Sequence, residues 1–499
     1  MKKYEKVFQK QYQDWYRENE AYREQVSRDK NRLQYHLMPE TGWLNDPNGL
    51  CQFHGWYHIY YQFTPFEPTG ELKLWGHYTT RDFVNYRQEE PVLFPDEDFD
   101  AHGVYSGSAW VEDDSIHYFY TGNVKYFDRP DYDYIMTGRG SNVVHVSSKD
   151  GYHMSKKECL LRNEDYPADM SAHIRDPKLI RWGKYYDMIL GARNDKGEGL
   201  VLVYRSEDLK HWQYHSRIQT TKPFGYMWEC PDLFVLDGQL LLICCPQGVE
   251  QKGVDFANVH QCTVMKLSYD ATKDLYEVEE KDGEADIHML DRGCDFYAPQ
   301  TFLDEKKRRI LIGWMGIPDA TYTNPTVEAG WQHALTLPRE LSFDGERLHQ
   351  TPLKELEALR REETSYTLSE LSKAERSDLV YEAEMTFSFC EQMTLTLRKG
   401  VTLHYQNHLL TLDLGEHGSG RGERSVQLTQ LENLRIYSDS SSLEIFVNDG
   451  VEVFTTRVYG LEGEIRLEGA CEGSGKLYSL RGFEIVKAEA KESEMQREN

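Results

Sequence analysis

No stretch of this sequence approaches the roughly 20 consecutive apolar residues that a membrane-spanning helix needs. The first residues, MKKYE, lead into a polar segment and not into the apolar core of a secretory signal peptide. We therefore expect a cytoplasmic protein that does not enter a membrane and whose substrate has to be imported into the cell.

Positive charge is also scarce: the chain has 57 Lys and Arg residues against 83 Asp and Glu residues, which gives a net charge of −26. A protein this acidic repels the phosphate backbone of nucleic acids and the head groups of anionic lipids. Neither nucleic acid nor a membrane surface is therefore expected among its partners.

Cysteine motifs are lacking as well. The nine cysteines include no CxxC pair, and several lie in apolar runs, as Cys244 and Cys245 do in LLLICCPQ. We expect buried, reduced thiols. His54 and His58 are four residues apart, but they fall in an expected β-hairpin, where this spacing separates two side chains along the strand. The sequence therefore predicts no metal and no cofactor.

Helical periodicity is rare, and its main occurrence is an N-terminal extension at residues 1–30. Apolar side chains recur there three, four or seven positions apart, at Phe8, Tyr12, Trp15, Tyr22 and Val26. This spacing is typical of an amphipathic helix. We expect the helix to pack against its own domain, and contact with a second subunit in a homodimer is the alternative.

A repeat of low identity follows. Five segments share a small or acidic first residue, in four of them a proline soon after it, then a short strand, a polar turn and a hydrophobic strand. They begin at Asp46, Gly107, Asp176, Cys230 and Ala298, which are 61, 69, 54 and 68 residues apart. Strand pairs repeated at long, similar intervals predict a five-bladed β-propeller over residues 31–350. A sandwich of irregular hairpins is the alternative, but it does not explain five similar openings.

The remainder of the chain reads as a second β domain. LKELEALRR indicates a helical linker at residues 351–365, and short alternating strands with turns such as Asn448-Asp449-Gly450 predict a C-terminal β-sandwich over residues 366–499. The last dozen residues of this region form a polar tail. Residues 418–422, GSGRG, mimic a phosphate loop, but no helical pattern follows them, so we expect a flexible hairpin turn. The expected fold is all-β, with a short N-terminal helix.

The propeller has a mechanistic consequence, because the innermost strands of its blades line one central channel. Asp46 and Asp176 open the first and third repeats, and Glu229 directly precedes the fourth. These three carboxylates are expected to meet, and their repulsion and burial raise the proton affinity of one of them. One carboxylate that attacks and one carboxylic acid that protonates are what glycoside cleavage needs.

The neighbours of these residues suggest how the roles are divided. Glu229 is expected to be the acid, because low-polarity residues adjoin it in MWECP, residues 227–231. Arg175 precedes Asp176, an arrangement that holds a carboxylate ionised and offers guanidinium donors to sugar hydroxyls.

The segments WLNDPNG, RDPK and ECP resemble the three signature motifs of the invertase and levanase group, glycoside hydrolase family 32. Further segments agree, among them Trp75-Gly76-His77, YTGNV, DFYAPQ and LTLPREL. The resemblance extends from about Tyr35 to LEIFVNDG. It implies a five-bladed propeller with an appended β-sandwich and a retaining β-fructofuranosidase that acts on sucrose or 6-phosphosucrose.

The resemblance also implies roles for individual residues. Asp46 would attack the fructosyl C2, Glu229 would protonate the departing oxygen and then activate water, and Asp176 would grip fructosyl hydroxyls. The two reacting carboxyls would be about 5 to 5.5 Å apart. The sugar pocket would be lined by Trp43, Asn45, Gln62, Trp75, Tyr105, Ser106, Arg175 and Trp314.

Within the family, YHLMPETGWLNDPNG, MWECPD and LDRGCDFYAPQTF are most similar to the bacterial sucrose-6-phosphate hydrolases. One departure is the long acidic segment 126–140, which is expected to reshape the leaving-group side of the pocket. The candidates for binding a 6-phosphate are Lys125, Arg129, Arg139 and Arg193. The alternatives are an exo-hydrolase of short fructo-oligosaccharides, a fructosyltransferase and a non-catalytic fructan sensor.

Overall fold

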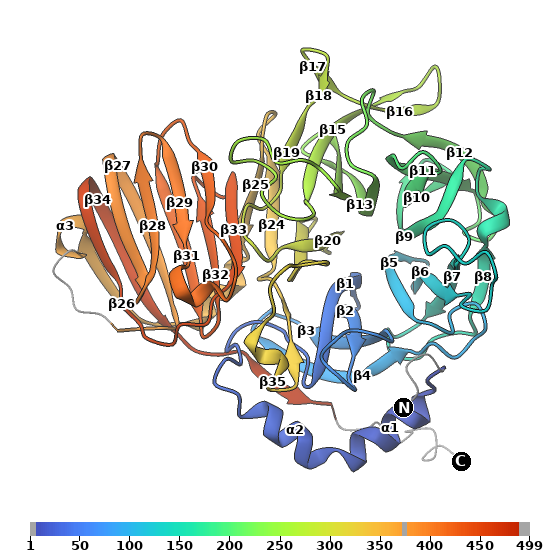
Figure 1. Cartoon of the computed structure of the whole chain (residues 1–499), viewed down its shortest axis with the longest axis horizontal. Helices are drawn as coiled ribbons and strands as arrows, with labels where there is room; N and C mark the ends of the chain where they lie inside the picture. Colours follow the sequence, from blue (N-terminus) through green and yellow to red (C-terminus); the bar gives the residue numbers. More distant parts are fainter. Residues whose placement is uncertain (1–5, 372–376, 489–499) are drawn as a thin grey trace.

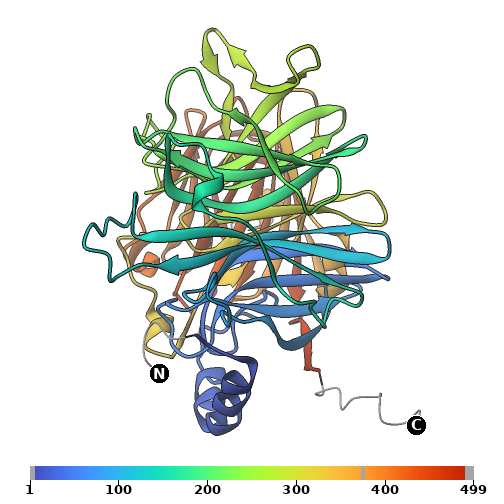
Figure 2. The ribbon, with the colours of Figure 1, turned by 90° about the vertical axis from the view of Figure 1, so that its right-hand side faces the viewer.

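The computed structural model describes residues 6–371 and 377–488. The chain is mostly β: a propeller is followed by a β-sandwich-like C-terminal domain beside it (Figure 1). Two short helices lie below the propeller, as the side view also shows (Figure 2). The predicted all-β class with a propeller and a C-terminal sandwich is therefore confirmed.

The propeller is built of antiparallel sheets arranged around a common axis (Figure 1). The first contains β1 (Gly42–Phe53), β2 (Trp56–Thr64), β3 (Leu74–Thr80) and β4 (Asn85–Leu93), and the second β5 (Val104–Glu112), β6 (Ser115–Lys125), β7 (Arg139–Ser148) and β8 (Glu158–Leu161). The next contains β9 (Met170–Trp182), β10 (Tyr185–Asn194), β11 (Gly199–Ser206) and β12 (Gln213–Ile218). It is followed by β13 (Met227–Leu236), β14 (Gln239–Gln247), β15 (Thr263–Asp270), β16 (Leu275–Val278) and β19 (Ile287–Met289), with a separate pair β17 (Glu280–Lys281) and β18 (Glu284–Ala285). The last contains β20 (Tyr297–Leu303), β21 (Arg309–Met315), β23 (Ala334–Leu335), β24 (Arg339–Phe343) and β25 (Leu348–Pro352).

The first strand of each of these sheets is interrupted at the same relative place. The register shifts lie between Leu44 and Pro47 in β1, Val104 and Gly107 in β5, Arg175 and Lys178 in β9, Glu229 and Asp232 in β13, and Tyr297 and Gln300 in β20. These are the places where the repeated segments of the sequence begin. Proline cannot donate to a strand ladder, and a bulge redirects the side chains beside it. The repeat openings are thus built to present side chains to a site.

Two parallel pairings close the structure. β22 (Trp331–Gln332) pairs with β1 and thereby joins the last sheet to the first. The backbone N–H of Gly42 donates to the carbonyl of Gly330 at 2.8 Å beside this pairing. After the sandwich, the chain returns to the propeller as β35 (Glu484–Lys487), which runs parallel to β4.

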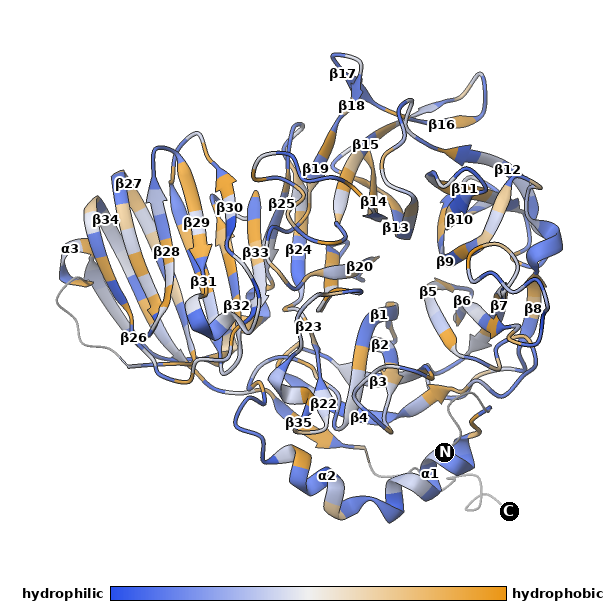
Figure 3. Cartoon of the chain, in the orientation of Figure 1, coloured by the Kyte–Doolittle hydropathy of each residue, from blue (hydrophilic) through white to orange (hydrophobic). Residues whose placement is uncertain are grey.

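The C-terminal domain has its own hydrophobic core. Buried residues alternate with more exposed ones along its strands, as in Leu403 and Tyr405 of β28 and Leu410 and Leu412 of β29, and the same alternation is visible in Figure 3. This pattern is typical of antiparallel sheets with one face on a core. The strands are β26 (Arg360–Thr367), β27 (Tyr381–Arg398), β28 (Val401–Gln406), β29 (Leu409–Asp413), β30 (Arg424–Gln427), β31 (Asn433–Asp439), β32 (Ser442–Val447), β33 (Glu452–Arg457) and β34 (Arg466–Leu480). The helical turns of the chain are η1 (Asn163–Asp165), η2 (Pro325–Val327), η3 (Lys354–Leu359), α3 (Leu368–Leu371) and η4 (Gly415–Gly418).

Buried ion pairs join the two domains. Arg339 pairs with Glu444 at 2.6 Å, and Arg421 pairs with Asp295 at 2.6 Å. Arg421 belongs to the GSGRG segment, which joins the paired strands β29 and β30 as the expected hairpin turn and also anchors it to the propeller through this ion pair. Breaking a buried ion pair leaves an uncompensated buried charge, which costs free energy. These two pairs therefore hold the sandwich against the propeller.

Three expectations are corrected. The N-terminal helix is two helices, α1 (Gln9–Glu18) and α2 (Glu20–Ser27), and the side chain of Asn19 between them donates to the Trp15 carbonyl at 2.8 Å. The predicted linker at 351–365 is helical only over η3, because Arg360–Thr367 pairs with β34. Cys390 and Cys471 form a disulfide, whereas the other cysteines are free thiols.

The N-terminal helices pack on the propeller of their own chain, as predicted. The ring of Tyr12 lies 6.0 Å from that of Phe94, and Val26 is buried with Trp331. Residues 1–5, and the predicted polar tail from residue 489 onward, lie outside the described residues.

Candidate active site

Three carboxylates from different sheets line one central cavity of about 520 Å³. Asp46 lies in β1, Asp176 in β9 and Glu229 in β13, each at the interruption of the first strand. Cys230 links them: its backbone N–H donates to Oδ2 of Asp176 at 2.9 Å, and its thiol lies 3.8 Å from Oδ2 of Asp46. The three carboxylates are far apart in the sequence but lie at one cavity, as the repeat predicted.

A chain of neutral hydrogen bonds fixes Asp46. The Trp43 indole donates to Asn45 at 2.7 Å, and the Asn45 amide donates to Oδ1 of Asp46 at 2.9 Å and to Gln62 at 2.7 Å. Gln62 donates to the Ser106 hydroxyl at 2.5 Å, and Ser106 donates to Oδ2 of Asp46. Burial raises the pKa of Asp46, whereas the bonds from Ser106 and Asn45 lower it. The donors thus hold the carboxylate in one orientation and offset part of the effect of burial, which still leaves the pKa of Asp46 raised.

The surroundings of Glu229 differ from the expectation. Arg175 forms an ion pair with its Oε1 at 2.9 Å, and Gln247 and Tyr297 donate to its Oε2 at 2.8 and 2.7 Å. The prediction that low-polarity residues surround the Glu229 carboxyl is wrong. Three polar side chains from other segments contact the carboxyl, whereas its sequence neighbours do not determine its surroundings. Arg175 does hold a carboxylate, and that carboxylate is Glu229.

Asp176 is buried and has an unusual backbone conformation. Its backbone has a φ of 64°, and its N–H donates to Thr121 at 2.9 Å. Burial raises the pKa of Asp176 to about 7, Arg175 lowers it, and the charges of Glu229 and Asp46 raise it. Asp176 therefore holds its proton more tightly than an exposed aspartic acid does.

Left-handed backbone recurs where the repeats open. Cys230 and Ala298 have φ values of 48° and 45°, and each, like Asp176, precedes a proline. Such conformations are uncommon for residues other than glycine and cluster at functional sites.

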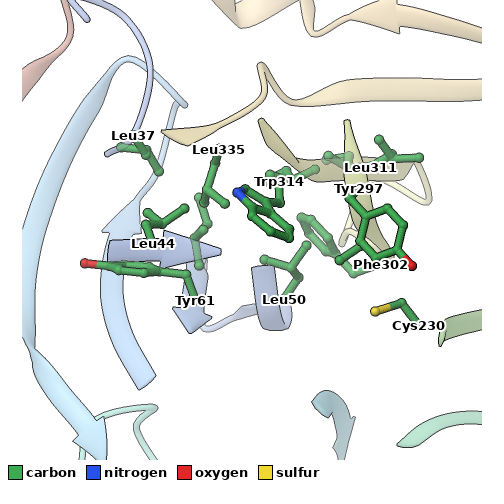
Figure 4. Packing of buried hydrophobic residues seen from close by; sticks show 14 of the residues in the cluster. Leu37, Leu44, Leu50, Tyr61, Cys230, Tyr297, Phe302, Leu311, Trp314 and Leu335 are labelled. Carbon is green, nitrogen blue, oxygen red and sulfur yellow. The ribbon is translucent and has the colours of Figure 1, made fainter. Parts of the chain in front are cut away.

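Most of the predicted sugar-binding residues line the cavity. Trp43 and Trp314 form part of its wall, with ring centres 6.0 Å apart. Trp314, Tyr297 and Cys230 belong to a buried hydrophobic cluster (Figure 4), so the core holds this side of the cavity. Asn45, Gln62, Tyr105, Ser106 and Arg175 also line it.

Trp75 was expected to line the sugar pocket, but its side chain is fully buried and is not among the residues that line the cavity. Its indole donates to the backbone carbonyl of Tyr105 at 3.1 Å. Trp75 thus supports a wall residue from behind.

Several cavity residues were not predicted as parts of the site. Tyr297 belongs to the DFYAPQ motif quoted above, and its place before a repeat opening is the signal that points to it. No motif marks the others, which come from strand ends and from the 126–140 loop. They include Lys73, Tyr134, Ile135, His173, Tyr226, Gln247, Pro318 and Asp319.

The four candidates for a phosphate site separate clearly. Arg139 and Arg193 line the cavity, whereas Lys125 and Arg129 do not. Arg129 is exposed and pairs with Asp131 at 2.8 Å. Lys73 is a further cation at the cavity, 4.8 Å from the Trp43 ring, and burial lowers its pKa to about 7.

Family models cover both domains of the chain. The N-terminal domain of glycosyl hydrolases family 32 matches residues 36–352, and the C-terminal domain of the same family matches residues 355–483. The chain belongs to glycosyl hydrolase family 32.

Family 32 relatives match over nearly the whole chain. The sucrose-6-phosphate hydrolases of Bacillus subtilis and Staphylococcus xylosus are 36% and 38% identical, over 90% and 91% of this chain and 93% and 92% of their own length. The structure of sucrose-6-phosphate hydrolase from Lactobacillus gasseri has a TM-score of 0.84 at 26% identity and covers 96% of this chain and 100% of that one. A GH32 beta-fructofuranosidase of Bombyx mori in complex with sucrose has a TM-score of 0.76 at 26% identity and covers 94% and 98%.

A family 32 glycoside hydrolase needs a carboxylate that attacks and a carboxylic acid that protonates the leaving oxygen, and the cavity supplies three carboxyl groups. Within residues 6–371 and 377–488, no cluster of His, Cys, Asp and Glu side chains is arranged to hold a metal ion. No helix in the same part of the chain is long and apolar enough to cross a membrane.

Proposed function

We propose that this family 32 hydrolase cleaves the fructosyl bond of sucrose 6-phosphate, and also that of sucrose, with retention of configuration. The observation that carries the proposal is the meeting of Asp46, Asp176 and Glu229 from three sheets at one cavity. The names of the relatives and the sucrose complex of a similar structure support the choice of substrate.

In the first step, an Asp46 carboxylate oxygen attacks the fructosyl C2 while the Glu229 carboxyl donates its proton to the departing glucosyl oxygen. The C2–O bond breaks and a covalent fructosyl ester of Asp46 forms. Asn45 and Ser106 hold Asp46 for this attack, because they donate to both of its oxygens.

In the second step, Glu229 takes a proton from a water molecule, which attacks C2 and releases fructose and the Asp46 carboxylate. Asp176 accepts hydrogen bonds from fructosyl hydroxyls and its charge favours the oxocarbenium-like transition state. Reaction through a covalent ester requires the two reacting carboxyls about 5 to 5.5 Å apart, which stays a prediction.

The proton for the leaving oxygen comes from the carboxyl cluster. Burial raises the pKa of Asp176 to about 7, Arg175 lowers it, and the charges of Glu229 and Asp46 raise it. Sugar hydroxyls that donate to Asp176 favour its ionised form. The proton that Asp176 releases can then pass through Glu229 to the leaving oxygen.

Hydrolysis in the presence of methanol tests the proposal. Methanol competes with water for the fructosyl ester, and retention gives methyl β-fructofuranoside, whose configuration NMR identifies. Formation of the α-anomer would contradict the double displacement. Binding of either sugar without any release of fructose would instead identify a sensor.

We further propose that the sheets opened by β1, β5, β9, β13 and β20 are the five blades of the propeller. The shared interruption of these strands supports this reading. A cytoplasmic location and a homodimer stay predictions, which cell fractionation and light scattering check.

A further inference from the structure

One wall of the cavity gathers basic side chains. Arg139, His173, Arg175 and Arg193 all line it, in a protein whose net charge is −26. Arg175 pairs with Glu229, but no carboxylate of the described residues forms an ion pair with Arg139 or Arg193. Two cations at the cavity that lack a direct ion-pair partner point to an anionic ligand.

Arg139 is nearly fully buried, with 1% of its surface exposed. Its Nη2 donates to the Tyr134 hydroxyl, and its guanidinium carbon lies 4.2 Å from the centre of the Tyr134 ring. Its buried Nε has no hydrogen-bond partner among the described residues. A buried donor without an acceptor is costly, so the hydrogen bonds of this guanidinium are incomplete within the described residues.

Arg193 and His173 complete the wall. The guanidinium of Arg193 lies 4.8 Å from the centre of the Tyr226 ring. The pKa of His173 is far below its usual range because of burial and then because of the charges of Arg175, Arg139 and Arg193. His173 is therefore neutral, and its surroundings show that the potential at this wall is positive.

The basic wall lies on the Glu229 side of the cavity. Arg175 contacts Glu229 at 2.9 Å and His173 at 3.1 Å, so the cations adjoin the proposed acid. The acid must reach the departing oxygen, which places the leaving sugar next to these cations. The neutral network around Asp46 forms the other side.

We propose that Arg139 and Arg193 bind a phosphate group on the leaving sugar and thereby make the enzyme selective for a phosphorylated disaccharide. This inference deepens the proposed function and rests on it. A guanidinium fork matches two phosphate oxygens, and two such groups can share a dianion. Arg139 is the first residue of β7 and stands near the end of the long 126–140 segment, so the segment that departs from the family pattern positions one of the two arginines.

Lys73 is the rival cation. It lies at the same cavity but beside Trp43, and its Nζ donates to the carbonyl of Gly70. A phosphate bound by Lys73 would lie on the fructosyl side, because Trp43 belongs to the network that holds Asp46.

The test compares kcat/KM for sucrose 6-phosphate with kcat/KM for sucrose in the intact enzyme. We expect Arg193→Gln to lower the ratio of the two values about tenfold, and Arg139→Gln with Arg193→Gln to lower it about 100-fold or more. Arg193→Lys is expected to keep part of the preference, since it keeps the charge. Arg129→Gln, an exposed arginine of the same loop, is the matched control and should leave the ratio unchanged.

Two further readouts do not depend on whether the Arg139 variant folds. Glucose 6-phosphate should inhibit the unaltered enzyme more strongly than glucose does. The preference should also rise between pH 5 and 7, because the second pKa of a phosphate monoester is about 6, and this rise should be lost in Arg193→Gln.

The outcomes separate the two proposals. Release of fructose from neither sugar would overturn the proposed function and this inference together. Hydrolysis of both sugars with a ratio that the arginine variants do not change would overturn only the phosphate site. A ratio that falls in Lys73→Gln and not in Arg193→Gln would place the phosphate on the fructosyl side and contradict binding by Arg139 and Arg193.

Discussion

The two walls of the cavity are built on opposite principles. Around Asp46, the side chains of Trp43, Asn45, Gln62 and Ser106 satisfy one another in a continuous chain of hydrogen bonds. The basic wall holds Arg139 and Arg193, which form no ion pair among the described residues, and the buried Nε of Arg139 has no hydrogen-bond partner there. On the fructosyl side, the hydrogen bonds are made before substrate binds, and such preorganisation favours catalysis. On the leaving-group side, the proposed phosphate supplies the partners that the arginines lack, and this dependence on the ligand favours substrate selectivity.

The largest losses of activity are expected for the two reacting residues, the nucleophile Asp46 and the acid Glu229. Asp46→Asn and Glu229→Gln should each lower kcat by about 10³-fold or more, because one removes the nucleophile and the other the transferable proton. Steady-state assays check this, with circular dichroism to show an intact fold. Activity within tenfold of the unaltered enzyme in either variant would refute the assigned role.

Asp176→Asn is expected to lower activity and, above pH 7, to raise stability. The folded-state pKa of Asp176 is raised to about 7, so ionising it costs stability as the pH rises from about 4 to 7. The variant lacks this cost and should be more stable by about 1 to 4 kcal/mol above pH 7, with no gain near pH 4, while kcat falls at least about 100-fold. Thermal unfolding at both pH values measures the gain.

The control for this prediction is Asp319→Asn, because Asp319 lines the same cavity but its side chain is 74% exposed. Its stability should not acquire a new pH dependence. A loss of stability above pH 7 in Asp176→Asn would show that the buried charge is well compensated in the native protein.

Ser106→Ala should shift the pH profile. The Ser106 hydroxyl lowers the pKa of Asp46, so its removal raises that pKa and moves the acid limb of kcat/KM to higher pH by about one unit. Ser108→Ala is the matched control, since Ser108 is buried two residues away and donates to the Pro177 carbonyl at 2.7 Å. A shift of equal size in both variants would indicate a general disturbance of β5.

The smallest effect is expected at the open wall. Tyr134→Ala removes the ring that lies against Arg139 and should lower kcat/KM for sucrose 6-phosphate about three- to tenfold. Tyr134→Phe keeps the ring and should lose less. Tyr132→Ala changes an exposed aromatic residue of the same loop and is expected to have no effect. An equal loss in Tyr132→Ala would mean that the loop acts as a whole.

The sequence was most informative for features that can be recognised within one contiguous segment. The repeat openings predicted the propeller and the meeting of Asp46, Asp176 and Glu229, because each unit opens with a small or acidic residue and four of the five have a proline soon after it. The family motifs implied that Asn45, Gln62 and Ser106 line the sugar pocket, but not the hydrogen bonds between them. The existence of the C-terminal strands followed from their alternation.

Contacts between distant segments could not be predicted in the same way. Gln247 and Tyr297 reach Glu229 from other strands, so its sequence neighbours gave a wrong picture of its surroundings. The strand at Arg360–Thr367 depends on its partner β34, and the helix-like sequence before it concealed this. Trp75 matches a family motif, but only coordinates show that it lies behind Tyr105.

Trapping of the covalent intermediate tests the central claim most directly. The enzyme is mixed with sucrose 6-phosphate, quenched rapidly in acid and digested, and the peptides are analysed by mass spectrometry. We predict a fructosyl ester on Asp46 and an unmodified Asp176 under conditions of turnover. An ester on Asp176, or turnover that proceeds with no ester on any carboxylate, would contradict the account.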